Sequence, residues 1–209
     1  RHRPQGCSGG LDRDGVLNQE PDEEKGYVLS PDNWIWLPGA LEGLAMIAGA
    51  GVPISIATNQ SCIGRGLIDT DQLAQIHTKV KREAAARGVF FAGIHFCPHA
   101  PEDDCRCRKP RPGLLEAAMD QSGIPPGKTV FIGDAARDLQ AAQAAGVHSW
   151  LVRTGRGLQT EADMGKMVIA ELDPAKVAVF DDLLAACRAM FESNDPKQEA
   201  ADEKFCPNC

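Results

Sequence analysis

Two aspartates separated by a single residue stand near the start of the chain, in the segment LDRDGVLN. If Leu11 ends a β-strand, Asp12 and Asp14 point to the same side as the chain leaves the sheet. Two nearby carboxylates with different pKa values can divide the work of a phosphoryl transfer. One attacks phosphorus and forms an acyl phosphate, while the other protonates the leaving oxygen and later deprotonates water. The alternative is a solvated Asp-x-Asp-Gly turn, which is a common structural motif.

Three other residues are of types that suit the same chemistry. Asp134 follows a strand-like segment, and a carboxylate that converges there with Asp12 suits Mg²⁺, whose remaining positions phosphate oxygens can fill. Lys109 could neutralise charge on a transferring phosphoryl group, and Thr58 could donate a hydrogen bond to it. Taken singly, a surface lysine and a strand-end hydroxyl are ordinary. Taken together, these residues indicate a magnesium-dependent phosphoryl-transfer site.

A second chemically distinctive cluster lies in HFCPHAPEDDCRCRKPRPG, residues 95–113. Its candidate metal ligands are Cys97, His99, Cys105 and Cys107. Three thiolates and one imidazole complete a tetrahedral zinc shell of the structural kind, with no position left for water. We expect the ion to pin the loop 97–107 so that Arg108 and Lys109 point at a phosphate. The alternative is a reduced cysteine-rich loop without metal.

These residues need a scaffold that brings distant segments together, and the hydrophobic pattern predicts one. Strand-like and helix-like segments alternate, which is typical of an α/β fold with a mostly parallel sheet and helices on both faces. The expected strands are 52–58, 89–96, 128–134 and 147–152, with one more before Asp12, and the expected helices are 69–88, 113–123, 136–146 and 182–191. In such sheets functional groups gather at the carboxyl ends of the strands, which is where Asp12, Thr58, Cys97 and Asp134 lie.

Composition and charge narrow the class of protein. The 209 residues carry a formal net charge of −7, which argues against broad binding of nucleic acid or a membrane surface. No apolar run reaches the ~18–20 residues of a membrane span, and no secretory signal is recognisable. We therefore expect a cytoplasmic protein without nucleic-acid or membrane partners. A monomer is expected as well, although no sequence feature determines the oligomeric state. Thiols stay reduced in that compartment, so the eight cysteines suit metal ligands or buried small residues better than disulfides.

The chain is expected to form one domain over residues 1–191, followed by a flexible polar tail over 192–209. The tail ends with Cys206 and Cys209, a lone pair that would supply only half of a tetrahedral zinc site. Thr58 and the next expected strand are joined by about one helix, so we expect no large cap domain.

The order of the candidate residues resembles the four sequence motifs of the haloacid-dehalogenase (HAD) superfamily of phosphatases. The resemblance extends over about residues 11–157 and rests on Asp12-x-Asp14, Thr58, Lys109 and Gly133-Asp134-x-x-x-Asp138. It implies a HAD-like Rossmannoid fold in which Asp12 attacks phosphorus and Asp14 is the acid and base. It also implies that Thr58 and Lys109 hold the phosphoryl oxygens. The implied Mg²⁺ ligands are Asp12, the backbone carbonyl of Asp14, and Asp134, with Asp138 supporting the site.

The loop CPH…CRCRKPRPG narrows the resemblance to the D,D-heptose 1,7-bisphosphate 7-phosphatases and the similar histidinol-phosphate phosphatases. Three segments favour the heptose branch, namely KGYV at 25–28, TNQSCIGRG at 58–66 and LVRTGRG at 151–157. The implied substrate contacts are Gly26, Tyr27, Asn59, Gln60, Ser61, Arg108 and Lys109.

The reaction that this resemblance implies is Mg²⁺-dependent hydrolysis of the C7 phosphate of a small phosphorylated sugar, a heptose bisphosphate. It would serve lipopolysaccharide-precursor or related nucleotide-heptose synthesis. Hydrolysis of histidinol phosphate is the alternative within the class. A catalytically impaired, zinc-stabilised binding module is the alternative outside it.

Three departures from the family pattern are visible. The segment before Asp12, RPQGCSGGL, carries proline and glycines where a buried central strand is expected. Ala135 follows Asp134 where many relatives carry lysine, and Arg137 could supply the missing phosphate contact. Cys62 replaces a glycine, which could change the local turn. No chemical role is expected for His77, His95 or His148, and Cys187 is expected in the core.

Overall fold

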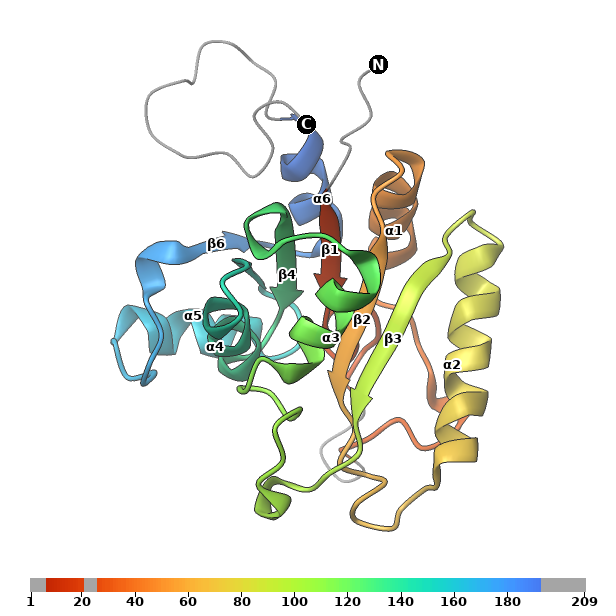
Figure 1. Ribbon diagram of the computed structural model, residues 1–209. Coiled ribbons are helices and arrows are strands. Elements are labelled where there is room, and N and C mark those ends of the chain that lie inside the picture. Colours follow the sequence, from red (N-terminus) through yellow and green to blue (C-terminus); the bar gives the residue numbers. More distant parts are fainter. Residues whose placement is uncertain (1–6, 21–25, 193–209) are drawn as a thin grey trace.

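The computed structural model describes residues 7–20 and 26–192, and its six strands form one sheet (Figure 1). The strand order is β3-β2-β1-β4-β5-β6, and every neighbouring pair is parallel. The strands are β1 (Ser8–Leu11), β2 (Ile54–Asn59), β3 (Phe91–Cys97), β4 (Thr129–Gly133), β5 (His148–Val152) and β6 (Val177–Phe180). Because all strands run the same way, their carboxyl ends meet at one edge of the sheet.

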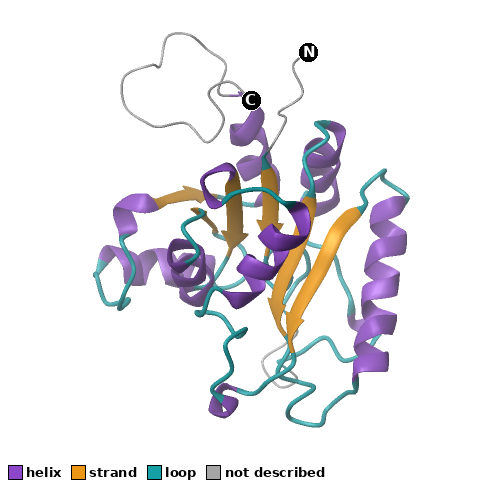
Figure 2. Cartoon of the chain, in the orientation of Figure 1, coloured by secondary structure: helices purple, strands orange, loops and turns teal. Residues whose placement is uncertain are grey.

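Helices cover both faces of the sheet (Figure 2). They are α1 (Ala40–Gly49), α2 (Thr70–Ala85), α3 (Gly113–Ser122), α4 (Ala136–Ala144), α5 (Gly157–Gly165) and α6 (Leu183–Glu192), with 3₁₀ turns at Pro31–Asn33, Pro101–Asp103, Pro126–Lys128 and Pro174–Lys176. On one face, Leu44 of α1 and Leu183 of α6 join the main core with Ile132 of β4. On the other face, Leu115 of α3 packs against Phe131, the next residue towards the start of β4. Successive residues of a strand thus serve opposite cores.

The elements expected from the sequence are present, with small shifts at their ends, and the predicted fold class is confirmed. The sequence pattern missed α1, α5 and β6. The α1 segment ALEGLAMIAG is nearly uniform in hydrophobicity, because it is enclosed between α6 and the sheet, and therefore has no clear polar face. The strand β6 has four half-buried residues at the sheet edge, which is too short for a recognisable pattern.

The glycine-rich segment before Asp12 does form the central strand β1, between β2 and β4. A Cβ on Gly10 would lie 2.8 Å from Cδ2 of Phe131, so the ring occupies the space that a side chain would need. Gly9 points to the opposite face, where the nearest atom to an added Cβ is the carbonyl oxygen of Pro53 at 4.0 Å. Packing therefore requires glycine at position 10, whereas position 9 has room for a Cβ atom.

Some expectations fall on parts of the chain that are not described. The tail predicted over 192–209, with Cys206 and Cys209, lies outside the described residues apart from Glu192, which ends α6. Pro4 and Lys25 also lie outside them. Within ranges 7–20 and 26–192, none of the helices combines the length and apolar character needed to span a bilayer.

The two glycines of β1 should respond oppositely to the same substitution. Gly9→Ala should raise the free energy of unfolding by about 0.5–1 kcal/mol, because it reduces the freedom of the unfolded chain without a clash. Gly10→Ala should lower it by about 1–3 kcal/mol, because the Phe131 ring must move in a packed core. Urea denaturation of both variants measures the difference. Equal stability of the two variants would contradict the packing argument.

Candidate active site

The predicted catalytic residues meet at the carboxyl edge of the sheet. Asp12 follows β1, Asp134 follows β4, and Thr58 lies at the end of β2. Lys109 reaches the same place from the loop that joins β3 to α3. All four side chains are buried, so the site is built into the sheet edge and not on a mobile surface.

Three carboxylates gather there without enough positive charge to neutralise them. Oxygens of Asp12, Asp134 and Asp138 lie within 4.8 Å of one another, and all three residues are buried. Burial and the Asp138 carboxylate raise the pKa of Asp12 to about 6. Burial, Asp138 and Asp12 raise the pKa of Asp134 well above its usual value. Asp134 Oδ1 is buried without a hydrogen-bond partner, so this donor set fits a divalent cation that prefers oxygen ligands.

Lys109 is a buried ammonium group, 1% exposed, with three protein oxygens close to its Nζ. Its Nζ lies 2.9 Å from Asp12 Oδ1, 2.7 Å from Asp138 Oδ1 and 2.8 Å from the carbonyl oxygen of Ala57. Although burial lowers the pKa of Lys109, Asp12 and Asp138 raise it above its usual value overall. Burial would likewise raise the pKa of Asp138, but Lys109 and Arg137 lower it overall. Lys109 and Asp138 therefore form an ion pair beside the Asp12 carboxylate.

Asp14 is held by donors on several sides. Arg13 donates to it from Nε at 3.2 Å and from Nη2 at 3.0 Å, and Asn18 Nδ2 donates at 2.9 Å. Gln60 Nε2 donates to Asp14 Oδ2 at 2.9 Å. Burial would raise the pKa of Asp14, but the Arg13 charge and these hydrogen bonds lower it overall. Asp14 is therefore a fixed, ionised carboxylate next to Asp12 when no other anion is near.

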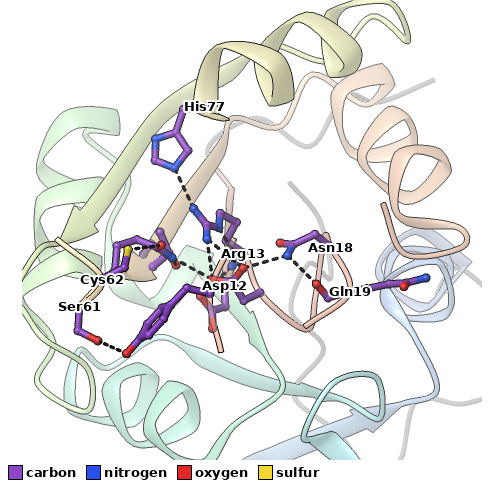
Figure 3. A network of polar contacts seen from close by, with 12 residues as sticks. Asp12, Arg13, Asn18, Gln19, Ser61, Cys62 and His77 are labelled. Atoms are coloured by element: carbon purple, nitrogen blue, oxygen red, sulfur yellow. Dashed lines mark hydrogen bonds and ion pairs between the residues drawn. The ribbon is translucent and has the colours of Figure 1, made fainter. Parts of the chain in front are cut away.

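The structure reveals supporting residues that sequence reasoning missed (Figure 3). Arg13 is 1% exposed and lies between Asp14 and His77, with 3.4 Å between its Nη1 and His77 Nε2. Asn18 also reaches Asp14. A basic residue between two aspartates is visible in the sequence, but its burial is not. The partner His77 lies on α2, more than sixty residues away in the chain, and no local pattern joins the two.

Two predicted substrate contacts also hold catalytic groups. Asn59 Oδ1 accepts from the backbone N–H of Lys109 at 3.1 Å, and Asn59 Nδ2 donates to the Lys109 carbonyl at 3.0 Å. Gln60 Nε2 donates to Thr58 Oγ1 at 2.8 Å as well as to Asp14. Cys62, which departs from the family pattern, is buried with its thiol 3.7 Å from Gln60 Oε1. These contacts fix the positions of Lys109, Thr58 and Asp14.

The other predicted substrate contacts lie on loops. Tyr27 Oη lies 3.0 Å from Ser61 Oγ, so the 26–28 segment is joined to the loop after β2. Gly26 is exposed and has a positive φ of 59°. Arg108 Nη1 donates to the carbonyl of His99 at 3.2 Å.

Asp134 is enclosed by two backbone segments from distant parts of the chain. An added Cβ on Gly15 or Gly155 would lie 2.2 Å or 2.3 Å from Asp134 Oδ2, and both residues have positive φ. The backbone N–H of Arg156 donates to Asp134 Oδ2 at 2.8 Å, and Thr154 Oγ1 donates to the Gly15 carbonyl at 2.6 Å. Glycine is therefore needed at both positions so that the loop 153–157 can approach Asp134.

The four expected zinc ligands converge in space. Cys97 Sγ lies 3.5 Å from both His99 Nδ1 and Cys105 Sγ, and Cys107 Sγ lies 3.4 Å from His99 Nδ1 and 3.5 Å from Cys105 Sγ. Zinc at its usual distances of ~2.3 Å to sulfur and ~2.0 Å to nitrogen requires ligand atoms about 3.5–3.8 Å apart. The cluster therefore has the size and the donor set of a closed tetrahedral zinc site.

Comparisons with known proteins agree with this geometry. A family model described as HAD-hydrolase-like matches residues 106–186. The D-glycero-beta-D-manno-heptose-1,7-bisphosphate 7-phosphatase of Bordetella bronchiseptica is 42% identical over 187 residues, which cover 87% of this chain and 96% of that protein. The protein of the same name from Pseudomonas aeruginosa is 37% identical over 182 residues, which cover 87% of this chain and 96% of that protein.

A solved structure is also similar. The crystal structure of D,D-heptose 1,7-bisphosphate phosphatase from B. bronchiseptica, complexed with magnesium and phosphate, gives a TM-score of 0.81 at 40% sequence identity. The match covers 89% of this chain and 98% of that one. The likeness thus extends over most of the chain.

The parallel sheet with buried carboxylates at its carboxyl edge defines a phosphatase of the HAD-like hydrolase class. This confirms the superfamily that the sequence motifs indicated. Within that class, the chain belongs to the family of the D-glycero-beta-D-manno-heptose-1,7-bisphosphate 7-phosphatases.

Two neighbouring carboxylates should affect the stability of the metal-free protein in opposite ways. The pKa of Asp134 is raised in the folded state, so this side chain binds more protons in the folded protein than in the unfolded chain, and its contribution to stability falls as the pH rises above about 4. At pH 8 in a chelator, Asp134→Asn should therefore raise the free energy of unfolding by about 1 kcal/mol or more. This gain should vanish below about pH 4, where both side chains are neutral.

The matched control is Asp138→Asn, since the pKa of Asp138 is lowered and its charge pairs with Lys109. That variant should be less stable than the original protein at pH 8. Denaturation curves at pH 4 and pH 8 measure both effects. A destabilised Asp134→Asn variant at pH 8 would show that the carboxylates do not repel one another as described.

Proposed function

We propose that this phosphatase hydrolyses the phosphate ester at C7 of a D,D-heptose 1,7-bisphosphate, in lipopolysaccharide-precursor or related nucleotide-heptose synthesis. Relatives of that name, 37–42% identical over most of the chain, support the substrate. The observation that carries the chemistry is the buried Asp12 carboxylate, paired with Lys109 and next to the fixed Asp14. In the proposed reaction Asp12 is the nucleophile and Asp14 is the acid–base group at one phosphoryl group.

The reaction has two steps at phosphorus. In the first step, an Asp12 oxygen attacks phosphorus, the bond from phosphorus to the sugar oxygen breaks, and that oxygen takes the bonding electrons and a proton from Asp14. In the second step, water attacks the aspartyl phosphate, the bond from phosphorus to Asp12 breaks, and Asp14 takes a proton from the water. Phosphate leaves, with ionised Asp12 and protonated Asp14 restored.

The first step needs a protonated Asp14, although the Arg13 charge lowers its pKa in the free protein. A negatively charged phosphate ester near Asp14 opposes this effect, because like charges disfavour ionisation. Binding of the substrate would thus raise the affinity of Asp14 for the proton that the leaving oxygen requires.

Thr58 and Lys109 are suited to stabilise the phosphoryl group. Thr58 Oγ1 accepts a hydrogen bond from Gln60, so its own O–H remains available to donate. The Lys109 ammonium lies close to oxygens of Asp12, Asp138 and Ala57, so it would act through its charge or by exchanging its Asp12 contact for a phosphoryl oxygen.

The carboxylate site fits Mg²⁺, because Asp134 Oδ1 is buried without a partner and the pKa values of Asp12 and Asp134 are raised. We propose that Asp12, Asp134 and the backbone carbonyl of Asp14 hold the ion. When bound, Mg²⁺ supplies charge that neutralises the phosphoryl oxygens and aligns them with the nucleophile. The solved relative that contains magnesium and phosphate supports this proposal.

The second metal in the proposal is a structural Zn²⁺ held by Cys97, His99, Cys105 and Cys107. Its function is to fix the loop 97–107, since Arg108 bonds to the His99 carbonyl and Lys109 follows immediately. With the loop fixed, Asn59 can hold the Lys109 backbone at a constant place at the sheet edge.

The proposed substrate contacts are Gly26, Tyr27, Asn59, Gln60, Ser61, Arg108 and Lys109. Asn59 and Gln60 would also position Lys109, Thr58 and Asp14. The proposal includes a monomer that acts in the cytoplasm, one catalytic domain over residues 1–191, and no nucleic-acid or membrane partner.

Asp12→Asn should abolish phosphate release, by at least about a thousandfold, because a carboxamide is a poor nucleophile. The assay measures phosphate from heptose 1,7-bisphosphate and from histidinol phosphate, with Mg²⁺ and with a chelator. Heptose bisphosphate should be hydrolysed faster, and only with Mg²⁺. The variant should keep the circular dichroism spectrum of the original protein. Faster turnover of histidinol phosphate would overturn the sugar assignment, and no release from any ester would favour a non-catalytic zinc-stabilised module.

Cys105→Ser should remove the zinc and lower the thermal stability, since a structural site contributes metal-binding energy of about 10 kcal/mol to folding. Activity should fall because Arg108 and Lys109 lose their fixed loop. Elemental analysis should give one zinc per chain for the original protein and much less for the variant. The control Cys187→Ala changes a buried cysteine of α6 outside the cluster and should retain zinc. Full zinc content in Cys105→Ser would show that the ligand set is wrong.

A further inference from the structure

The Arg13 guanidinium is a buried cation with contacts on opposite sides. Its Nε and Nη2 donate to Asp14, and Nη1 lies 3.4 Å from His77 Nε2. The ring of Trp34 lies under it, with 5.8 Å from Cζ to the ring centroid. An arginine side chain has many rotamers, so contacts on both sides are needed to hold its planar group in one orientation. Asp14 provides one contact, and His77 provides the opposing one.

His77 is in the right state to accept a hydrogen bond from Arg13. It is buried on α2, and its ring packs against Phe96 in an edge-type arrangement with 6.1 Å between the ring centroids. Burial, Arg13 and Lys81 lower its pKa to about 3, against a smaller opposite effect of Asp14. The imidazole is thus neutral near neutral pH, and a neutral imidazole offers one ring nitrogen as an acceptor. Arg13 has only donors, so Nε2 is the accepting nitrogen in this contact.

We propose that His77 is a positioning residue for Asp14, because it fixes the Arg13 guanidinium that in turn holds the Asp14 carboxylate at the leaving oxygen. The inference rests on the proposed function, in which Asp14 protonates that oxygen. His77 itself touches no reacting atom. It contacts Arg13 (Figure 3), and Arg13 in turn donates to Asp14. No motif of the sequence pointed to it.

This role predicts a dependence on the leaving group. When the bond from phosphorus to a sugar oxygen breaks, the departing alkoxide is a strong base and needs the Asp14 proton. When 4-nitrophenyl phosphate is cleaved, the departing nitrophenolate is stable without a proton. A misplaced Asp14 therefore slows cleavage of the sugar ester and spares cleavage of the aryl ester. General damage to the fold slows both reactions alike.

The experiment compares three variants of the full chain in Mg²⁺ at pH 7.5. His77→Leu removes the acceptor, His77→Gln retains an acceptor at a similar distance, and Val80→Ala is the control. Val80 is buried on the same helix and has no part in the polar network, so its truncation disturbs α2 packing alone. The measured quantity is kcat/KM for heptose 1,7-bisphosphate and for 4-nitrophenyl phosphate, because kcat/KM reports the step in which the leaving group departs.

His77→Leu should lose about tenfold in kcat/KM for the sugar ester and less than about twofold for the aryl ester. His77→Gln should restore most of the loss, and Val80→Ala should leave the ratio of the two values unchanged. A crystal structure of His77→Leu should show the Arg13 guanidinium and the Asp14 carboxylate displaced.

Equal losses for both esters, or an undisplaced Asp14 in the His77→Leu crystal structure, would overturn the inference and leave His77 as a packing residue. The inference is also overturned if His77→Gln loses as much kcat/KM for the sugar ester as His77→Leu does. Failure of the proposed function has a different signature, since the original protein would then release no phosphate from the sugar ester.

Discussion

Mutual repulsion among three buried carboxylates is the constraint on which the active site depends. Asp12, Asp134 and Asp138 are enclosed at the sheet edge, where burial strengthens every electrostatic interaction. The Lys109 ammonium compensates two of them by direct contact. Asp134 has only a backbone donor, and one of its oxygens has no partner. The protein thus maintains an electrostatically unfavourable site, which is typical of sites built for a cation or a reaction.

The other residues of the site mainly fix the positions of the catalytic groups and add little charge. Asn59 binds the backbone of Lys109 with both polar atoms of its side chain, and Gln60 joins Asp14 to Thr58. The cysteine cluster adds a third support. Arg108, which directly precedes Lys109, donates a hydrogen bond to the carbonyl of His99, a member of that cluster. Residues that face a ligand in such a site also orient their neighbours. A role in substrate contact and a role in positioning are therefore compatible for Asn59 and Gln60.

The sequence predicted the scaffold and the reactive groups better than the contacts between them. The alternation of strands and helices follows from local periodicity, and so does the place of Asp134 at the end of a strand. The structure has both features. The strand β1 was doubtful, because local propensity disfavours glycine, and only the Phe131 ring from a distant strand explains why Gly10 is needed. Arg13 and His77 were missed for a similar reason. Their chemistry depends on burial and on a contact between the segment that follows β1 and α2, which no nearby residue encodes.

The central place of β1 has a consequence for how the chain is made. Ser8 in β1 pairs with Thr129 in β4, and 121 residues separate them. At a ribosomal rate of about 5–20 residues per second, roughly ten seconds pass between synthesis of β1 and synthesis of β4, its partner on one side. During that interval the nascent polypeptide exposes an unpaired strand edge, which is a template for wrong pairing with other chains. A short strand with little side-chain surface presents a smaller apolar target to such partners than a strand of large apolar residues would.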